Sequence, residues 1–430
     1  MSNYFQLSNE ELQNELKDLR ALHESFTKDS LKLDMTRGKP GADQLDLCED
    51  MLGILQKNED CFDDEGLDCR NYGILDGIPA AKELFADLLG VCKEQVIVGG
   101  NSSLNMMYDA FSRAFCFGNC DSERPWSKED KIKFLCPAPG YDRHFSICQQ
   151  FGIEMITVPM LEDGPDMDVI EKAVSSDASI KGIWCVPKYS NPTGTVYSNE
   201  VVRRFAALKP LAPDFRIFWD NAYAVHDLYD EHPEILNILD ACEEAGNPDM
   251  VFMFSSTSKI SYPGSGVAVL ASSVKNIEYI KKQMGVQTIG SDKLNQLRHI
   301  KMFKDKAAIH AQMKKHAVIL RPKFEAVDSA LERDLAGKGI ATWSKPLGGY
   351  FVSFNSMEGC AKRIFELCEE AGVALTKAGA TFPYGLDPED SNIRIAPSFP
   401  PVSELMVAMD RFTVCVRIAS IEKILAERGV

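Results

Sequence analysis

Short apolar segments alternate with amphipathic segments between roughly residues 80 and 275. Several of the short segments are almost continuously apolar and end in Gly, Pro or Ser, which is typical of strands buried on both faces. We expect strands at residues 95–98, 132–136, 154–158, 182–186, 216–219, 251–254 and 267–270. Apolar residues at helical spacing predict helices at residues 83–89, 104–115, 168–174 and 201–208. The pattern predicts an α/β fold with a mostly parallel, seven-stranded sheet covered by helices.

The pattern changes beyond about residue 300. A long polar helix containing Met302, Ala308 and Met313 leads to Arg321-Pro322. Strand-like residues 350–354 and 393–395 follow with a helix between them, and a final helix runs from residue 405 to 425. These elements predict a smaller α+β unit. We expect a large domain of residues 60–300 and a discontinuous second unit, formed by the N-terminal arm (residues 1–59) and residues 301–430.

Composition excludes several classes of protein. With 47 basic and 63 acidic residues, the chain has a net charge of −16, which argues against binding the nucleic-acid backbone. No apolar segment is long enough for a transmembrane helix, and the polar N-terminus does not resemble a signal peptide. Most of the 13 cysteines lie in apolar segments without CxxC spacing, as expected of reduced core residues in the cytoplasm. Cys116 and Cys120 have no histidine nearby, so we expect no metal site.

Polar residues follow five of the predicted strands. They are residues 99–103, 137–141, 187–194, 220–223 and 255–259. Ligands of open α/β sheets bind at the carboxyl ends of the strands, so these residues are expected to lie together. Together they supply a phosphate cradle, an aromatic ring, an amide, a carboxylate, a phenol and an amine. That set suits a pyridine ring bearing an aldehyde and a phosphate.

Three motifs carry a family resemblance: Asn191-Pro192-Thr193-Gly194, Asp220-Asn221-Ala222-Tyr223 and Ser256-Thr257-Ser258-Lys259. In their order and spacing the chain resembles a class I, fold type I aminotransferase dependent on pyridoxal 5'-phosphate. It is most similar to a bacterial subgroup of aspartate aminotransferases with an Arg-Gly-Lys-Pro segment near the N-terminus. The resemblance implies a homodimer that acts on an amino acid and a 2-oxo acid.

The resemblance assigns catalytic roles to Lys259, Asp220 and Tyr223. Lys259 forms the Schiff base with the cofactor and then moves the α-proton of the substrate. Asp220 pairs with the pyridine nitrogen and keeps it protonated; a helix cap is the alternative reading of this carboxylate. Tyr223 and Asn191 hydrogen-bond the phenolic oxygen of the cofactor, although Asn191 also suits the turn of its own motif.

The remaining cofactor contacts are implied in the same way. Tyr141 stacks on the cofactor ring, and His144 supports Asp220. Backbone and hydroxyl groups bind the phosphate, from Asn101, Ser102, Ser103 and Ser256. Tyr72 reaches the phosphate of the other subunit. The family usually places an arginine about eight residues after the lysine to neutralise the phosphate, and residues 262–267 contain no cation.

Two arginines are candidates for binding the substrate. Arg394 matches the residue that holds the α-carboxylate, and an edge-strand salt bridge is its alternative. Arg37 lies with Gly38 in a segment that the family folds over the substrate, where it could bind a distal carboxylate. Lys39 and Lys293 are lesser candidates, and Arg37 could also be a surface charge.

The function expected from these residues is transfer of an amino group between an amino acid, aspartate first, and 2-oxoglutarate. Another reaction on the same cofactor, such as a β-lyase or decarboxylase, remains open because the pocket selects the bond that breaks. A cofactor-binding transcriptional regulator is the non-enzymatic alternative. Such regulators carry an added DNA-binding domain, and only about 70 residues precede the first motif here.

Overall fold

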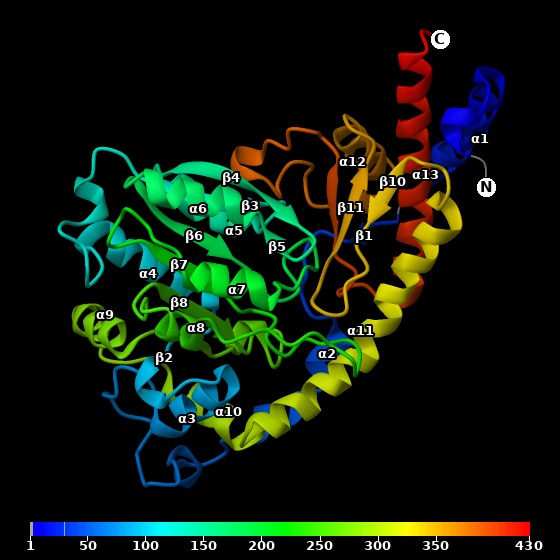
Figure 1. Ribbon diagram of the computed structural model, residues 1–430. Coiled ribbons are helices and arrows are strands. Elements are labelled where there is room, and N and C mark those ends of the chain that lie inside the picture. The colour runs from blue at the N-terminus through cyan, green and yellow to red at the C-terminus, as the bar shows by residue number, and fades with distance from the viewer. Residues whose placement is uncertain (1–2, 30) are drawn as a thin grey trace.

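The computed structural model describes residues 3–29 and 31–430, and its main feature is an eight-stranded sheet (Figure 1). The strands are β2 (Val96–Val98), β3 (Lys133–Ala138), β4 (Glu154–Leu161), β5 (Gly164–Pro165), β6 (Ile180–Cys185), β7 (Arg216–Asp220), β8 (Val251–Ser256) and β9 (Ala268–Ala271). Their order is β2-β9-β8-β7-β6-β3-β4-β5. The neighbouring strands in the run β8-β7-β6-β3-β4 are parallel. At the two edges of the sheet, β9 is antiparallel to both β8 and β2, and β5 is antiparallel to β4. The seven expected strands are confirmed. The eighth, β5, has only two residues, too few to form a sequence pattern.

Helices cover both faces of this sheet because successive strand residues point to opposite sides. Phe218 packs on one side with α4 (Ser103–Phe117), α5 (Asp142–Gln150) and α9 (Val274–Gln287). Ile217 and Trp219 pack on the other, where the helices are α3 (Pro79–Leu89), α6 (Met167–Ser176), α7 (Asn199–Ala206), α8 (Ile238–Glu244) and α10 (Lys293–Phe303). The four helices listed from the sequence pattern are thus present. The strands are buried on both sides except β4, which has exposed residues along one side.

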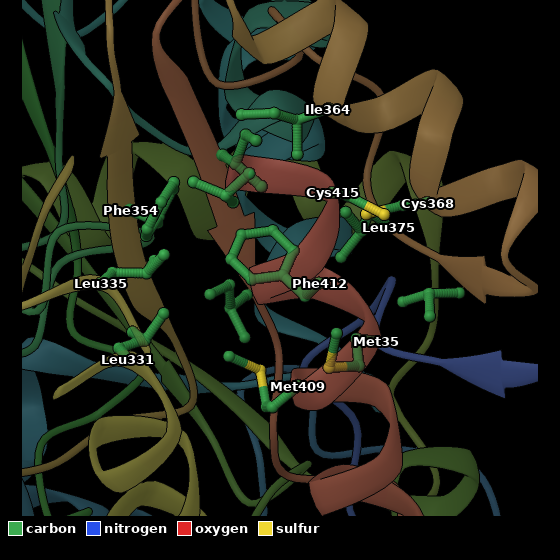
Figure 2. Packing of buried hydrophobic residues seen from close by; sticks show 14 of the residues in the cluster. Met35, Leu331, Leu335, Phe354, Ile364, Cys368, Leu375, Met409, Phe412 and Cys415 are labelled. Atoms are coloured by element: carbon green, nitrogen blue, oxygen red, sulfur yellow. The ribbon is translucent and has the colours of Figure 1, made fainter. Parts of the chain in front are cut away.

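A second core lies beside the sheet. Its strands β10 (Ala341–Trp343), β11 (Val352–Ser356) and β13 (Asn392–Ile395) form an antiparallel sheet, and β1 (Leu33–Asp34) pairs with β12 (Val373–Ala374). Helices α12 (Ala361–Glu370) and α13 (Val402–Glu427) pack here, and α1 (Asn9–Thr27) lies along α13 (Figure 1). Phe412 of α13 meets Phe354 of β11 edge-on, at 5.0 Å between ring centroids (Figure 2). The N-terminal arm as far as Met35 is therefore packed with the C-terminal part of the chain, whereas Cys48 and Met51 belong to the core of the large sheet.

One helix, α11 (Lys306–Leu335), contributes to both cores. Ile309 and Met313 pack against the large sheet, whereas Leu320 belongs to the second core. The segment leading to Arg321-Pro322 is divided into α10 and α11, and α11 continues through Pro322. A proline has no N–H, so the carbonyl of Val318 loses its helical hydrogen bond at Pro322. Both residues lie on an exposed face of α11, where water can bind this carbonyl instead. Although α11 and α13 are long, no helix in the described residues is apolar enough over sufficient length to span a membrane.

Candidate active site

Asp220 lies at the end of β7 and is 3% exposed. It points to the same side of the sheet as Phe218, since both are two residues apart on one strand. On that side α5 places His144 with Nε2 at 3.1 Å from Asp220 Oδ2. The His144 ring is stacked on Trp184, at 4.4 Å between centroids. The other carboxylate oxygen, Oδ1, is buried and has no hydrogen-bond partner among the described residues. A buried unpaired oxygen of this kind is suited to a cationic donor supplied by a ligand.

Lys259 lies in the turn that follows β8, the strand next to β7. Its amine is 5.0 Å from the ring centroid of Tyr223 and 5.8 Å from that of Tyr350. Burial lowers the pKa of Lys259, and the negative charge of Asp220 opposes part of this shift. Burial also raises the pKa of Tyr223 well above its ordinary value, so its hydroxyl keeps its proton. An amine that loses its proton easily is suited to act as a nucleophile and a base.

Arg394, on β13, is buried and meets residues from the large sheet. Its Nη1 donates to Asp142 Oδ1 at 3.0 Å and to Asn191 Oδ1 at 3.1 Å, and its Nη2 donates to Thr376 Oγ1 at 3.1 Å. Its guanidinium also lies 4.8 Å from the ring centroid of Phe351. The Nε group is buried without a partner among the described residues. The structure thus brings Arg394 and Asn191 together, with Asp142 as a carboxylate that a substrate carboxylate could replace.

Tyr141 precedes α5, and burial raises the pKa of its phenol to about 12. It contacts His144 edge-on, with 4.9 Å between ring centroids. Four further residues lie around this site and were not expected from the sequence: Asp142, Thr376, Tyr350 and Phe351. Of these, Asp142 had a usable signal, because it directly follows Tyr141 at the start of a helix.

The expected phosphate site lies at the N-terminus of α4. Ser102 is the N-cap residue of this helix, and its side chain makes no capping hydrogen bond. Ser256 Oγ donates to Ser258 Oγ, and Ser258 Oγ donates to the carbonyl of Asn101, both at 3.1 Å. A side chain at Gly266 would come within 2.9 Å of that carbonyl, so glycine permits the close approach. Hydroxyls and free helix N–H groups therefore gather at one place, as an anion requires.

The usual arginine position corresponds here to Val267, which is buried. Its N–H donates to Thr257 Oγ1 at 2.9 Å. The apolar side chain supplies no cation to the phosphate site, in agreement with the departure noted in the sequence.

The Arg-Gly-Lys-Pro segment approaches Arg394 through Phe351. A side chain at Gly38 would collide with the ring of Phe351, which stacks on Arg394. Thr376, a partner of Arg394, also donates to the carbonyl of Thr36 at 2.6 Å. Arg37 itself is exposed, and its guanidinium makes no hydrogen bond or ion pair within residues 3–29 and 31–430. The segment thus packs against Phe351, and the Arg37 guanidinium has no partner among the described residues.

The two lesser candidates are already partnered. Lys39 lies 3.6 Å from Asp34 and 3.7 Å from the ring centroid of Phe399. Lys293 donates to the carbonyl of Gly73 at 3.0 Å. Neither amine is as free as the Arg37 guanidinium.

Tyr72 is 84% exposed. It lines a surface cavity of about 740 Å³ formed by residues 69–73 and 287–294. Of the other predicted residues, it lies near Lys293, which lines the same cavity.

One group of possible metal ligands lies elsewhere. Cys120, Asp121 and Asp249 bring their ligand atoms within 4.8 Å of one another. Lys275 already lies between the carboxylates, 2.5 Å from Asp121 and 2.9 Å from Asp249, and Arg216 donates to Asp121 at 2.7 Å. The group is explained as a cluster of ion pairs.

Solved structures with the same architecture define the class of protein. The crystal structure of α-aminoadipate aminotransferase from Thermus thermophilus, complexed with N-(5'-phosphopyridoxyl)-L-leucine, has a TM-score of 0.74. It covers 99% of this chain and 97% of that chain at 19% identity, a level that shows the fold alone. The protein has the fold of the fold type I aminotransferases, an α/β architecture with a large, mostly parallel sheet, and this prediction is confirmed.

Closer relatives identify the family. The family model described as aspartate amino-transferase matches residues 7–428. The aspartate aminotransferase of Corynebacterium glutamicum is 48% identical over 406 residues, 94% of each chain. The crystal structure of an aspartate transaminase from the same organism has a TM-score of 0.95 and 47% identity, and covers 98% of this chain and 99% of that chain. The chain belongs to the aspartate aminotransferase family and is a pyridoxal-phosphate-dependent aminotransferase.

Proposed function

We propose that this enzyme transfers the amino group between aspartate and 2-oxoglutarate, with pyridoxal 5'-phosphate bound at Lys259. The observation that carries the proposal is the pair of buried side chains after β8 and at the end of β7. Burial lowers the pKa of the Lys259 amine, and Asp220 Oδ1 has no hydrogen-bond partner among the described residues. The name of the relative at 48% identity supports aspartate as the donor. We also assign the chain to the Arg-Gly-Lys-Pro subgroup, since Gly38 of this segment packs against the ring of Phe351, which lies next to the Arg394 guanidinium.

The residues present fit the cofactor. Asp220 would face the pyridine nitrogen, supported by His144, and Tyr141 would cover the ring. Asn191 and Tyr223 would donate to the phenolic oxygen. The phosphate would be held by the residues gathered at the start of α4, which are Asn101, Ser102, Ser103 and Ser256. When bound, the cofactor supplies an electron sink for the bond broken at the α-carbon of the substrate.

The side chains of this protein perform the remaining steps. Arg394 binds the α-carboxylate of the substrate, which replaces Asp142 as its carboxylate partner. Burial lowers the pKa of Lys259 and so favours the uncharged amine, whose Nζ can accept the α-proton of the substrate and later give it up. The carboxylate of Asp220 stabilises positive charge that faces its Oδ1. Enclosure by Tyr223 and Tyr350 limits the access of water to the amine.

The exposed side chain of Tyr72 supports a dimeric assembly. We propose a cytoplasmic homodimer in which Tyr72 reaches the phosphate of the other subunit, as its exposure beside the cavity of residues 69–73 and 287–294 permits. Within each subunit we assign residues 60–300 to the large domain, and residues 1–59 with 301–430 to the second unit. The pairing of β1 with β12 supports this discontinuous unit.

A half-reaction screen tests the function. The enzyme loaded with cofactor is mixed with each amino acid in turn, without 2-oxo acid, and the visible absorption of the lysine-bound cofactor is followed. We expect aspartate and glutamate to bleach this absorption with release of their 2-oxo acids, and Lys259→Ala to lack it from the start. Release of free ammonia would identify a lyase, and release of carbon dioxide would identify a decarboxylase. Bleaching and turnover retained in Lys259→Ala would refute the assignment of the lysine.

A further inference from the structure

The turn that carries Lys259 has its own polar framework. The N–H groups of Ile260 and Ser261 both donate to the carbonyl of Thr257, at 2.9 and 2.8 Å. These bonds close the backbone around Lys259. Two helices, α10 and α11, contact this turn, and each presents one buried histidine to it.

His299, on α10, is 1% exposed and meets the turn through two hydroxyls. Its Nδ1 lies 2.8 Å from the carbonyl of Asn295, and because a carbonyl only accepts, Nδ1 carries the proton. Its Nε2 is therefore an acceptor, and it lies 3.0 Å from Thr257 Oγ1 and 2.9 Å from Ser261 Oγ. The N–H of Val267 already donates to Thr257 Oγ1, which leaves the Thr257 hydroxyl proton for His299.

His316, on α11, is also 1% exposed and binds the same turn with the opposite tautomer. Its Nε2 lies 3.1 Å from the carbonyl of Ile260, so this nitrogen carries the proton. Its Nδ1 then accepts from Nε2 of Gln44 at 3.0 Å. The second proton of that amide goes to Tyr350 Oη at 2.8 Å.

Gln44 links this arrangement to the N-terminal segment. Its side chain is fully buried, and its Oε1 accepts from the N–H of Gly41 at 3.2 Å. Gly41 follows directly on the segment of Arg37 and Gly38. One amide therefore contacts the substrate-side segment, the ring of Tyr350 that faces Lys259, and the histidine that holds Ile260.

We propose that His299 and His316 are positioning residues, which fix the backbone on both sides of Lys259 and so set the place of its amine. Gln44 couples this arrangement to the N-terminal segment. The hydrogen bonds fall on Thr257, Ile260 and Ser261, the residues around the lysine in the chain, and not on the lysine itself. The inference rests on the proposed role of Lys259.

The test compares leucine and glutamine at each histidine. Leucine fills the space without a polar atom, whereas glutamine can donate to Ile260 at position 316 and accept from the hydroxyls at position 299. His310→Leu is the matched control, because His310 lies on the same helix as His316 and its side chain makes no hydrogen bond within the part of the chain described. For each protein we would measure kcat, KM for aspartate and the thermal midpoint. In addition, pyridoxal phosphate would be reduced onto the protein with borohydride, and the labelled Lys259 peptide quantified by mass spectrometry over time.

We expect His316→Leu and His299→Leu to lower kcat about 10-fold, the effect of one lost buried hydrogen bond, with KM changed less than about twofold. Labelling of Lys259 should slow in parallel, and the glutamine variants should recover most of both losses. If a leucine variant does not fold, Gln44→Leu removes the partner of His316 Nδ1 with the imidazole in place, and should still lower kcat several-fold.

Wild-type kcat and labelling in the folded leucine variants would overturn the inference, as would equal losses with leucine and glutamine that follow the thermal midpoint. Absence of label on Lys259 in the wild-type protein would instead refute the proposed function, whatever the histidine variants do.

Discussion

Asp220→Asn tests the central electrostatic argument, because it removes one charge and keeps the shape of the side chain. The carboxylate is buried, its Oδ2 is partnered by His144 at 3.1 Å, and its Oδ1 is left for a ligand. An amide at this position cannot stabilise a cation as the carboxylate does. Removing one partner of a buried charge pair costs about 3–5 kcal/mol. If this cost falls on the transition state, kcat decreases roughly 10²–10⁴-fold.

The assay is steady-state turnover with aspartate and 2-oxoglutarate, together with the cofactor retained after dialysis and the thermal midpoint. KM for aspartate should change little, since Arg394 keeps its own contacts. The control is Asp240→Asn, at an exposed position on α8, which should behave as the wild type. Near-wild-type turnover of Asp220→Asn would refute the reasoning and reduce the carboxylate to a partner of His144.

Three further predictions concern the substrate, the dimer and pH. Arg37→Ala should cost aspartate and glutamate roughly 2–4 kcal/mol in kcat/KM and alanine much less; equal losses for all three would mean that Arg37 shapes the site without reading the substrate. Mixed subunits of Tyr72→Ala and Lys259→Ala should regain about a quarter of wild-type activity, since half of the dimers carry one intact site; no recovery on verified mixing would contradict a shared site. Burial lowers the pKa of His299 from 6.5 to about 4. As the pH falls, the imidazole is therefore protonated in the unfolded chain before it is protonated in the folded protein. The free energy of unfolding that His299 contributes above pH 6.5 is lost as the pH falls toward 4. Between pH 7 and 5 this loss is about 2 kcal/mol, and urea unfolding of His299→Gln should lack it; an identical pH dependence in both proteins would show that His299 does not titrate in this way.

Much of the large domain can be read directly from the sequence. Most of its strands are apolar on both faces, and its helices are apolar on one face. The spacing of apolar residues along the sequence therefore identifies each element. Lys259, Asp220 and Asn191 are recognisable because they follow such strands, and strand ends of one direction meet at one edge of a sheet. Elements without such a pattern were not recognised, such as the two-residue strand β5 and the passage of α11 through Pro322.

The contacts between these residues depend on how the elements pack. Arg394 contacts Asp142 and Asn191, which lie 252 and 203 positions away in the chain. The local spacing of apolar residues cannot predict contacts over such distances in sequence. His299 and His316 look like ordinary residues of polar helices in the sequence, and only the packing of α10 and α11 against the turn after β8 brings them to Lys259. Local patterns of polarity report whether a residue is buried, because each residue leaves water individually. They do not report its partner, because hydrogen bonds join groups whose distance is set by the tertiary fold.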